Sequence, residues 1–401
     1  GSEMCIRDRP SVELAELLAR SLDVPDDQLE IFIECARGQR PVDHLERGSG
    51  DRTPQENTAH VRATAPPPLP PVSTPLIGRE TELALLQRLL AETWLVTMAG
   101  VGGIGKTRLA LAAAGEWRRA GHAAVFVSLA DLKPDDDLAA AIAESLGLQS
   151  SAEADPASQL LAYLSHKEML LVLDNFEQLL ASVGLLSQMH QAAPELTLLV
   201  TSRERLRLPG EQLLPLHGLD YPRDRSQESE GAGADGMVHY AAVQLFLNDA
   251  QRLMPSYVAD DDDALLELCR VTDGLPLALE LAAAWVETLT LPDLVQKLTQ
   301  NLDLLAKEEP FRPVRHHSIR AAFDTTWQFL GNAERDAFAR LSVFSGGFTR
   351  QAAQSIAGIS LPTLSTLAGR YLVKLDHTNG RYTLHELMRQ YAAEKLAAGP
   401  D

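Results

Sequence analysis

The stretch AGVGGIGKTRLALAAA, from Ala99 to Ala114, decides how the chain folds around it. Glycine recurs through its first seven residues, and a glycine-rich turn costs backbone entropy unless the turn has a special task. The residues from Lys106 onward are good helix formers. The preceding residues WLVTMA, 94–99, are apolar and favour a strand. We therefore expect a strand, a glycine-rich turn and a helix in direct succession.

The spacing of Gly100, Gly105, Lys106 and Thr107 matches the P-loop pattern, in the strand–turn–helix context that the motif requires. Glycines let successive backbone N–H groups turn inward and form a nest for phosphate oxygens. The helix N-terminus adds a favourable dipole. Lys106 then reaches the β- and γ-phosphates, and the Thr107 hydroxyl reaches Mg²⁺. The stretch predicts a site for ATP or ADP with Mg²⁺.

Two further strand ends carry polar residues that fit such a site. The run MLLVLD, 169–174, ends in Asp174, which we expect to hold Mg²⁺ through water. The run LTLLVTS, 196–202, is followed by Arg203, and an arginine at this edge of an open sheet can reach a γ-phosphate. A surface arginine remains the alternative for Arg203 on the sequence alone.

The composition narrows the class of protein. The chain has 401 residues, a length typical of two to four domains, and its formal net charge of −19 argues against general binding to nucleic acid or to a membrane surface. Its three cysteines are scattered, which favours a reducing compartment, and we expect a cytoplasmic protein. No apolar run has the length of a membrane span, and we expect no membrane partner.

Patterning along the chain predicts an α/β P-loop NTPase, a parallel sheet with helices on both faces, followed by an α-helical domain and a winged-helix domain. Strand runs at 94–99, 123–129, 169–174, 196–202 and 212–217 alternate with helical patterns. The Asn379-Gly380 pair predicts a hairpin with a type I′ turn. The expected segments are a helical remnant at 1–47, a Pro-rich linker at 48–74, the P-loop domain at 75–221, a mobile loop at 222–236, a helical domain at 237–310 and the winged helix at 311–401.

The motifs, in this order, resemble the STAND class of P-loop ATPases with an NB-ARC-like core. The family's entry motif is similar to residues 75–83, PLIGRETEL. Its GLPL motif is similar to residues 273–285, DGLPLALELAAAW, and its winged-helix histidine motif is similar to residues 382–392, YTLHELMRQYA. The resemblance covers residues 75 to about 396. It implies that Arg79 lies near the base, that Pro276 packs on the adenine, and that His385 reads the β-phosphate of ADP.

Simpler explanations exist for two of these residues. Pro276 can simply begin a helix, where its missing N–H costs nothing. Thr383 and Glu386 have the spacing of a capping box, which would explain that segment without a ligand. The residues expected to contact the nucleotide are Arg79, Gly100, Val101, Gly102, Gly103, Ile104, Gly105, Lys106, Thr107, Arg108, Arg203, Pro276 and His385.

The chain departs from the family where a second acid often follows the magnesium-binding aspartate. Asn175 stands there and cannot accept a proton, so Glu177 is the candidate base if the turn brings it toward the γ-phosphate. We expect Lys106, Asp174, Arg203 and Glu177 to carry slow ATP hydrolysis, with Thr107 and Asp174 as the magnesium side. Slow turnover suits a switch better than a metabolic enzyme.

The expected function is an ATP/ADP-controlled signalling switch of a bacterial regulator, locked closed by ADP and self-associating with ATP. Residues 9–38 resemble the last helices of an Xre-type helix-turn-helix domain. DNA contact is therefore expected only through an N-terminal domain mostly absent here, and an unknown signal only through a missing C-terminal region. The alternatives are the ATPase module of a defence or cell-death effector and a P-loop enzyme with a separate substrate.

Overall fold

The computed structural model describes residues 32–34, 67–72, 74–148, 155–222, 237–306 and 318–399. The chain divides into two compact units, residues 1–63 and 64–401. In the first unit only the helical residues 32–34 are described. Of the predicted segments 1–47, 48–74 and 222–236, only residues 32–34, 67–72, 74 and 222 are among the described residues.

The second unit begins with a five-stranded parallel sheet in the order β2-β3-β4-β1-β5. Every predicted strand run forms one of these strands, which confirms the α/β P-loop NTPase sheet. The strands are β1 (Leu95–Ala99), β2 (Ala123–Ser128), β3 (Met169–Asp174), β4 (Leu196–Ser202) and β5 (Glu211–Pro215).

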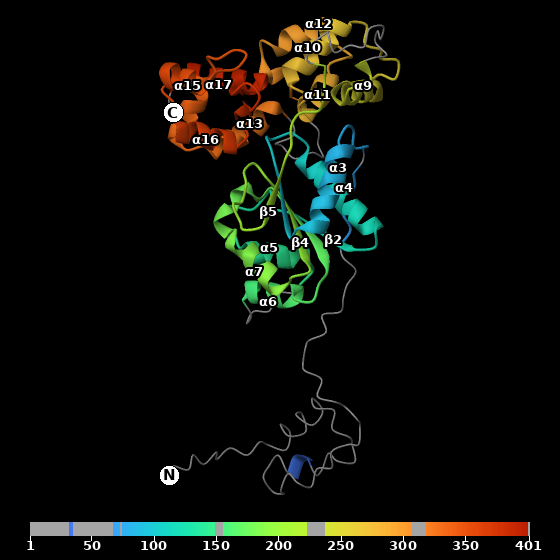
Figure 1. Cartoon of the computed structure of the whole chain (residues 1–401). Helices are drawn as coiled ribbons and strands as arrows, with labels where there is room; N and C mark the ends of the chain where they lie inside the picture. The colour runs from blue at the N-terminus through green and yellow to red at the C-terminus, as the bar shows by residue number, and fades with distance from the viewer. Residues whose placement is uncertain are drawn as a thin grey trace. The chain divides into compact units, whose positions relative to one another are not determined.

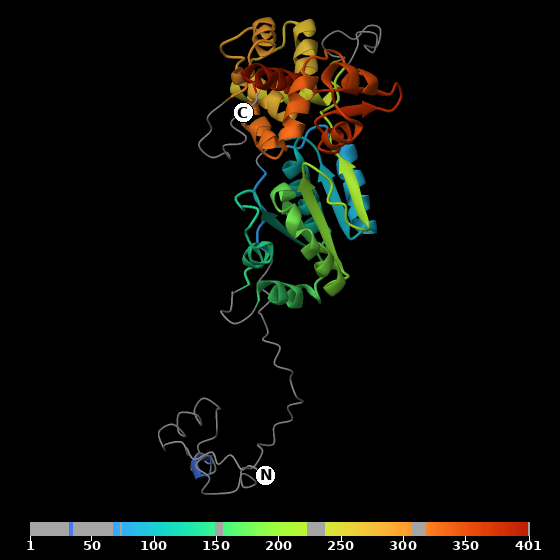
Figure 2. The same ribbon diagram turned by 90° about the vertical axis from the view of Figure 1, so that its left-hand side faces the viewer.

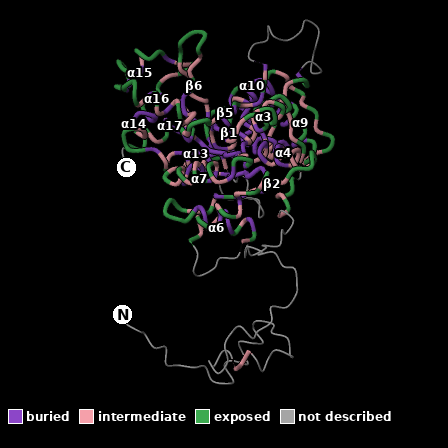
Figure 3. The backbone as a smooth tube through the Cα atoms, turned by 60° about the horizontal axis from the view of Figure 1, so that its bottom comes forward, coloured by how far each residue is buried: buried purple, intermediate pink, exposed green. Residues whose placement is uncertain are grey.

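Helices cover both faces of this sheet (Figure 1). Val96 and Met98 of β1 pack in one apolar core with helices α3 (Glu80–Glu92) and α4 (Lys106–Arg119). Leu95 packs in the core on the other face, with α5 (Leu138–Ser145), α6 (Pro156–Leu164) and α7 (Gly184–Ala192). Because neighbouring strand residues point to opposite faces, strands covered on both sides read as continuous apolar runs. In Figure 3 the tube around the label of β1, in the middle of the sheet, has the purple colour of buried residues.

Two short 3₁₀ segments, Phe176–Gln178 and Leu180–Ser182, follow β3. They turn the chain at the carboxyl edge of the sheet, where β1, β3 and β4 all end. Asn175 adopts φ 64 to start this turn, and its backbone N–H donates to the Thr201 hydroxyl. The turn places Glu177 beside Arg203, whose Nε donates to its Oε1 at 3.0 Å.

The remaining described residues are helical apart from one hairpin (Figure 2). The first group is α9 (Ala241–Leu253), α10 (Asp262–Thr272), α11 (Pro276–Ala283), α12 (Leu291–Leu298) and a 3₁₀ turn, Leu302–Leu304. The second group is α13 (Ile319–Gln328), α14 (Asn332–Leu341), α15 (Arg350–Ala357), α16 (Leu361–Gly369), β6 (Lys374–Asp376), β7 (Arg381–Thr383) and α17 (Glu386–Ala398). Both groups share an apolar core with α3 and α4.

The predicted hairpin forms, but its predicted turn type is wrong. A type I′ turn needs positive φ at both central residues, whereas only Gly380 has it, at 69°. Four residues connect β6 to β7. The Asp376 carboxylate holds this longer loop, because it accepts hydrogen bonds from the Thr378 N–H at 2.9 Å and from the Asn379 amide at 2.6 Å.

Candidate functional site

The glycine-rich turn lies between β1 and α4, as predicted. Gly103 and Gly105 have φ of 81° and 94°, which L side chains rarely adopt. A Cβ at Gly103 would also lie 2.9 Å from the Cβ of Leu277, so this position leaves no room for a side chain. Gly105 precedes α4 without a side-chain cap. The first backbone N–H groups of α4 therefore face the turn without competition from a capping side chain.

Lys106 folds back into this turn. Its Nζ donates to the carbonyl oxygens of Gly100 at 2.7 Å and of Val101 at 3.0 Å, and the residue is only 8% exposed. The ammonium is therefore held at the mouth of the nest, where phosphate oxygens would bind. If a phosphate replaced these two carbonyl contacts, the Lys106 ammonium would have hydrogen-bond acceptors both before and after the phosphate binds.

Asp174 is the centre of a buried polar network. Thr107 Oγ1 lies 2.9 Å from both carboxylate oxygens, and Thr201 Oγ1 lies 2.6 Å from Oδ1. The Asn175 amide donates to Oδ2 at 3.0 Å. The sequence argument placed Thr107 and Asp174 together, and the structure does so. It missed Thr201, whose only sequence signal is its position at the end of the strand before Arg203.

Arg203 and Glu177 form a buried ion pair beside that network. Arg203 Nε donates to Glu177 Oε1 at 3.0 Å, and the two residues are 8% and 9% exposed. The second oxygen, Glu177 Oε2, is buried and has no hydrogen-bond partner among the described residues. The Arg203 guanidinium also donates through Nη1 to the Thr326 hydroxyl and to the Ala322 carbonyl, both on α13. The alternative that Arg203 is a surface arginine is therefore wrong.

These groups line one cavity of about 460 Å³. One wall is the turn from Gly102 to Thr107, with Asp174, Glu177 and Arg203 at the sheet edge. Pro276 and Leu277 of α11 and Ala322 of α13 line the cavity as well. Pro276 begins α11 and also lines this cavity, so its two explanations are compatible.

Arg108 closes one end of the same cavity. Its Nη1 donates to Glu280 at 3.0 Å, and its Nη2 donates to the Thr74 hydroxyl and to the Pro75 carbonyl. This cluster joins the entry segment before α3 to helix α11 across the start of α4. Glu280 is a second residue that the sequence analysis missed, because nothing local marks it as a partner of Arg108.

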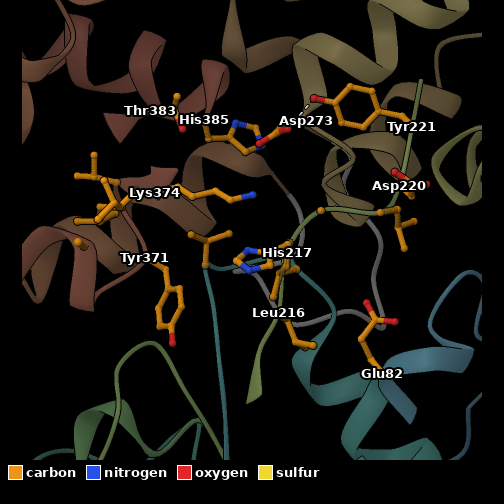
Figure 4. A pocket seen from close by; sticks show the side chains of 18 of the residues that line it. Glu82, Leu216, His217, Asp220, Tyr221, Asp273, Tyr371, Lys374, Thr383 and His385 are labelled. Carbon is orange, nitrogen blue, oxygen red and sulfur yellow. Dashed lines mark hydrogen bonds between the residues drawn. The ribbon is translucent and has the colours of Figure 1, made fainter. Parts of the chain in front are cut away.

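A second cavity, of about 610 Å³, is lined by three other predicted residues, Arg79, Val101 and His385, whereas Gly100 lines neither cavity (Figure 4). Arg79 donates to Glu82 at 2.6 Å and to the His217 carbonyl at 2.5 Å, and it is 5% exposed. Lys374 of the hairpin points into this cavity between His217 and His385. Desolvation, together with the charge of Lys374, lowers the pKa of His217.

His385 caps helix α17. Its Nδ1 accepts a hydrogen bond from the Leu387 N–H at 3.1 Å, so His385 and not Thr383 forms the cap. Its Nε2 is buried beside Asp273 without a hydrogen bond of standard geometry. Burial lowers the pKa of His385, and Asp273 opposes this effect. The structure thus places His385 in a different cavity from Lys106, although Val101 and Ile104 of the turn line the second cavity too.

The described residues hold no group of three or more His, Cys, Asp or Glu side chains able to bind a metal ion alone. A magnesium ion at a P-loop takes most of its ligands from phosphates and water, so one hydroxyl and one carboxylate suffice. Thr107 and Asp174 offer one hydroxyl and one carboxylate 2.9 Å apart, a donor set that would fit such an ion. In the part of the chain that the structure describes, no helix is long and apolar enough to cross a bilayer.

The sheet, the glycine-rich turn and the residues at the sheet edge define an α/β P-loop NTPase fold. A solved structure, the Walker-type ATPase paby2304 of Pyrococcus abyssi, has a similar fold, with a TM-score of 0.50 and 12% identity over 79% of this chain and 95% of that chain. No family model matches the chain.

Two curated relatives come from Mycobacterium tuberculosis H37Rv. One bears the provisional name HTH-type transcriptional regulator Rv0890c and is 34% identical over 325 residues, 78% of this chain and 35% of the relative. The other, the uncharacterized protein Rv0894, is 29% identical over 341 residues, 81% of this chain and 82% of the relative. The chain thus spans about a third of the length of Rv0890c and most of the length of Rv0894.

Proposed function

We propose that this chain is an ATP- and ADP-binding switch of a bacterial regulatory protein. The observation that carries the proposal is the composition of the 460 Å³ cavity, which the glycine-rich turn, Pro276 of α11 and Ala322 of α13 line together. A nucleotide there would touch the sheet and both helical groups at once. A ligand shifts a two-state chain only through unequal affinity for the two states, and such shared walls supply that inequality.

The donor set supports nucleotide as the ligand. Backbone N–H groups of the turn and Lys106 suit the α- and β-phosphates, and Pro276 offers an apolar surface for the base. Thr107 and Asp174 would hold Mg²⁺. The bound ion would neutralise charge that develops on the phosphates during hydrolysis. The resemblance assigns Arg79 to the region of the base, but Arg79 lines the second cavity. We propose only that Arg79 supports the turn, through its hydrogen bond to the Ile104 carbonyl.

We propose Glu177 as the base of a slow hydrolysis. Its Oε2 is buried and without a hydrogen bond, while Arg203 fixes its other oxygen. Asn175 has its amide committed to Asp174 and has no basic atom to offer.

The finer assignments remain part of this proposal. We propose a STAND-class ATPase with an NB-ARC-like core, in which residues 311–401 form a winged helix and residues 237–310 the helical domain. The helices and the hairpin of the second group support the winged helix. The curated name of Rv0890c supports a role in transcription regulation. Self-association with ATP, DNA binding through a preceding domain and sensing through a following region are proposed on the same basis.

His385 caps α17 in the second cavity in the present arrangement. A contact with the β-phosphate of ADP would therefore need the hairpin and α17 to move toward Lys106. We propose the contact only for such a rearranged state.

Turnover measurement tests the proposal against a metabolic enzyme. With saturating ATP and Mg²⁺ we expect fewer than about one turnover per minute, against a median near 10 per second for enzymes. Tight ADP binding should accompany it. Fast turnover or dependence on a second substrate would contradict the switch.

A further inference from the structure

Helix α13 reaches the phosphate side of the nucleotide cavity. A Cβ built on Gly102 of the turn would lie 3.2 Å from the Ala322 carbonyl oxygen and 3.4 Å from the Ala322 Cβ. Ala322 lines the cavity directly. Thr326 lies one turn further along the same face of α13, since residues four apart are neighbours on a helix. Both residues are buried, at 3% and 6% exposure.

Thr326 uses its hydroxyl twice at this point. Its Oγ1 accepts a hydrogen bond from Arg203 Nη1 and donates one to the Ala322 carbonyl at 3.2 Å. The same Nη1 of Arg203 also donates to the Ala322 carbonyl oxygen, at 3.3 Å. The guanidinium is therefore tied to α13 through one nitrogen and to Glu177 through Nε.

A γ-phosphate competes with α13 for this guanidinium. Arginine recognises phosphate best through two parallel N–H groups presented together. In the present arrangement Nε faces Glu177 and Nη1 faces Thr326, so no complete edge of the guanidinium can turn to a phosphate while both contacts persist. ADP makes no demand on Arg203, because it has no γ-phosphate.

We propose that Thr326 is a specificity-determining residue, which favours ADP over ATP by holding Arg203 on α13 and away from the γ-phosphate. This inference rests on the proposed nucleotide function and names the residue through which the third phosphate is discriminated. ATP binding breaks the contact between Arg203 and Thr326 and unseats the start of α13 from Gly102. ADP binding leaves both in place.

The test compares Thr326→Val with Thr325→Val by titration with ADP and with non-hydrolysable β,γ-methylene ATP, both with Mg²⁺. Valine keeps the shape of threonine and removes the hydroxyl. Thr325 is the matched control, because its hydroxyl donates only to the Ala321 carbonyl, at 2.9 Å, on the same helix. We expect Thr326→Val to raise the affinity for the ATP analogue about tenfold relative to ADP, equal to about 1.4 kcal/mol. Thr325→Val should leave the ratio unchanged.

An unchanged ratio in Thr326→Val, or an equal shift in Thr325→Val, overturns the proposal. Thr326→Ser and Thr326→Ala provide a second pair that does not depend on the valine variant folding. Serine keeps the hydroxyl and should retain the wild-type ratio, whereas alanine should shift it as valine does. If wild-type protein binds neither nucleotide, the proposed function itself fails, and that result differs from a failure of discrimination.

Discussion

Replacing Asp174 by Asn separates magnesium chemistry from nucleotide binding. The carboxylate accepts hydrogen bonds from Thr107, Thr201 and Asn175 at 2.6–3.0 Å and is 1% exposed. Asparagine keeps the shape but turns an amide N–H₂ toward one of these donors. The loss of about one hydrogen bond to a charged group lowers the free energy of unfolding by about 2 kcal/mol. For a domain of 150–250 residues, that corresponds to a fall in Tm of roughly 4–8 °C.

The functional effect of Asp174→Asn should be much larger on ATP turnover than on ADP affinity. Backbone N–H groups and Lys106 would hold ADP, so its Kd should change less than about threefold, or under 0.7 kcal/mol. Turnover should fall at least about a hundredfold, the effect of about 2.7 kcal/mol on the barrier. Calorimetry with ADP and phosphate release from ATP measure the two quantities, with the exposed Asp131→Asn as control. Equal losses in both assays would refute the assignment of Asp174 to the metal.

Three further variants test the base and the histidine. Glu177→Gln keeps an acceptor for Arg203 and removes the proton acceptor, so turnover should fall about a hundredfold with ADP affinity unchanged; undiminished phosphate release would exclude Glu177 as the base. His385→Ala should lower stability by about 1 kcal/mol through loss of the cap, whereas His385→Asn should retain it. Burial lowers the pKa of His385 in the folded state, so below about pH 6.5 the unfolded chain binds a proton at His385 that the folded chain does not bind. The free energy of unfolding of the wild type therefore decreases as the pH falls below this value. Urea unfolding at pH 7.5 and 5.5 should show a smaller loss for His385→Asn than for wild type. An ADP affinity about tenfold weaker in His385→Asn would instead indicate the β-phosphate contact.

The parts of the fold that depend on short stretches of sequence could be predicted. The central strands β1, β3 and β4 are buried along almost their whole length and read as continuous apolar runs, and Gly103 and Gly105 in the turn adopt a positive φ that favours glycine. The edge position of Asp174 and Arg203 follows because the carboxyl ends of parallel strands lie together.

What the sequence could not predict depends on contacts between distant segments. Nothing near Thr326 marks it as the partner of Arg203, because 123 residues separate them and only the packing of α13 on the turn brings them together. The predicted type I′ turn failed because the Asp376 carboxylate stabilises a longer loop than the Asn-Gly pair alone would form. The position of His385 in the second cavity likewise depends on how α17 packs on α10.

The central claim is that the glycine-rich turn binds nucleotide, and ADP calorimetry on wild type and Lys106→Ala tests it most directly. Lys106 Nζ already lies against the carbonyls of Gly100 and Val101, so its removal takes away the one ammonium at the mouth of the described cavity. The exposed Lys133→Ala is the control. We expect wild type and Lys133→Ala to bind ADP alike, and Lys106→Ala to lose at least about a hundredfold, or 2.7 kcal/mol, while it remains folded. Undiminished ADP binding by folded Lys106→Ala would contradict the account.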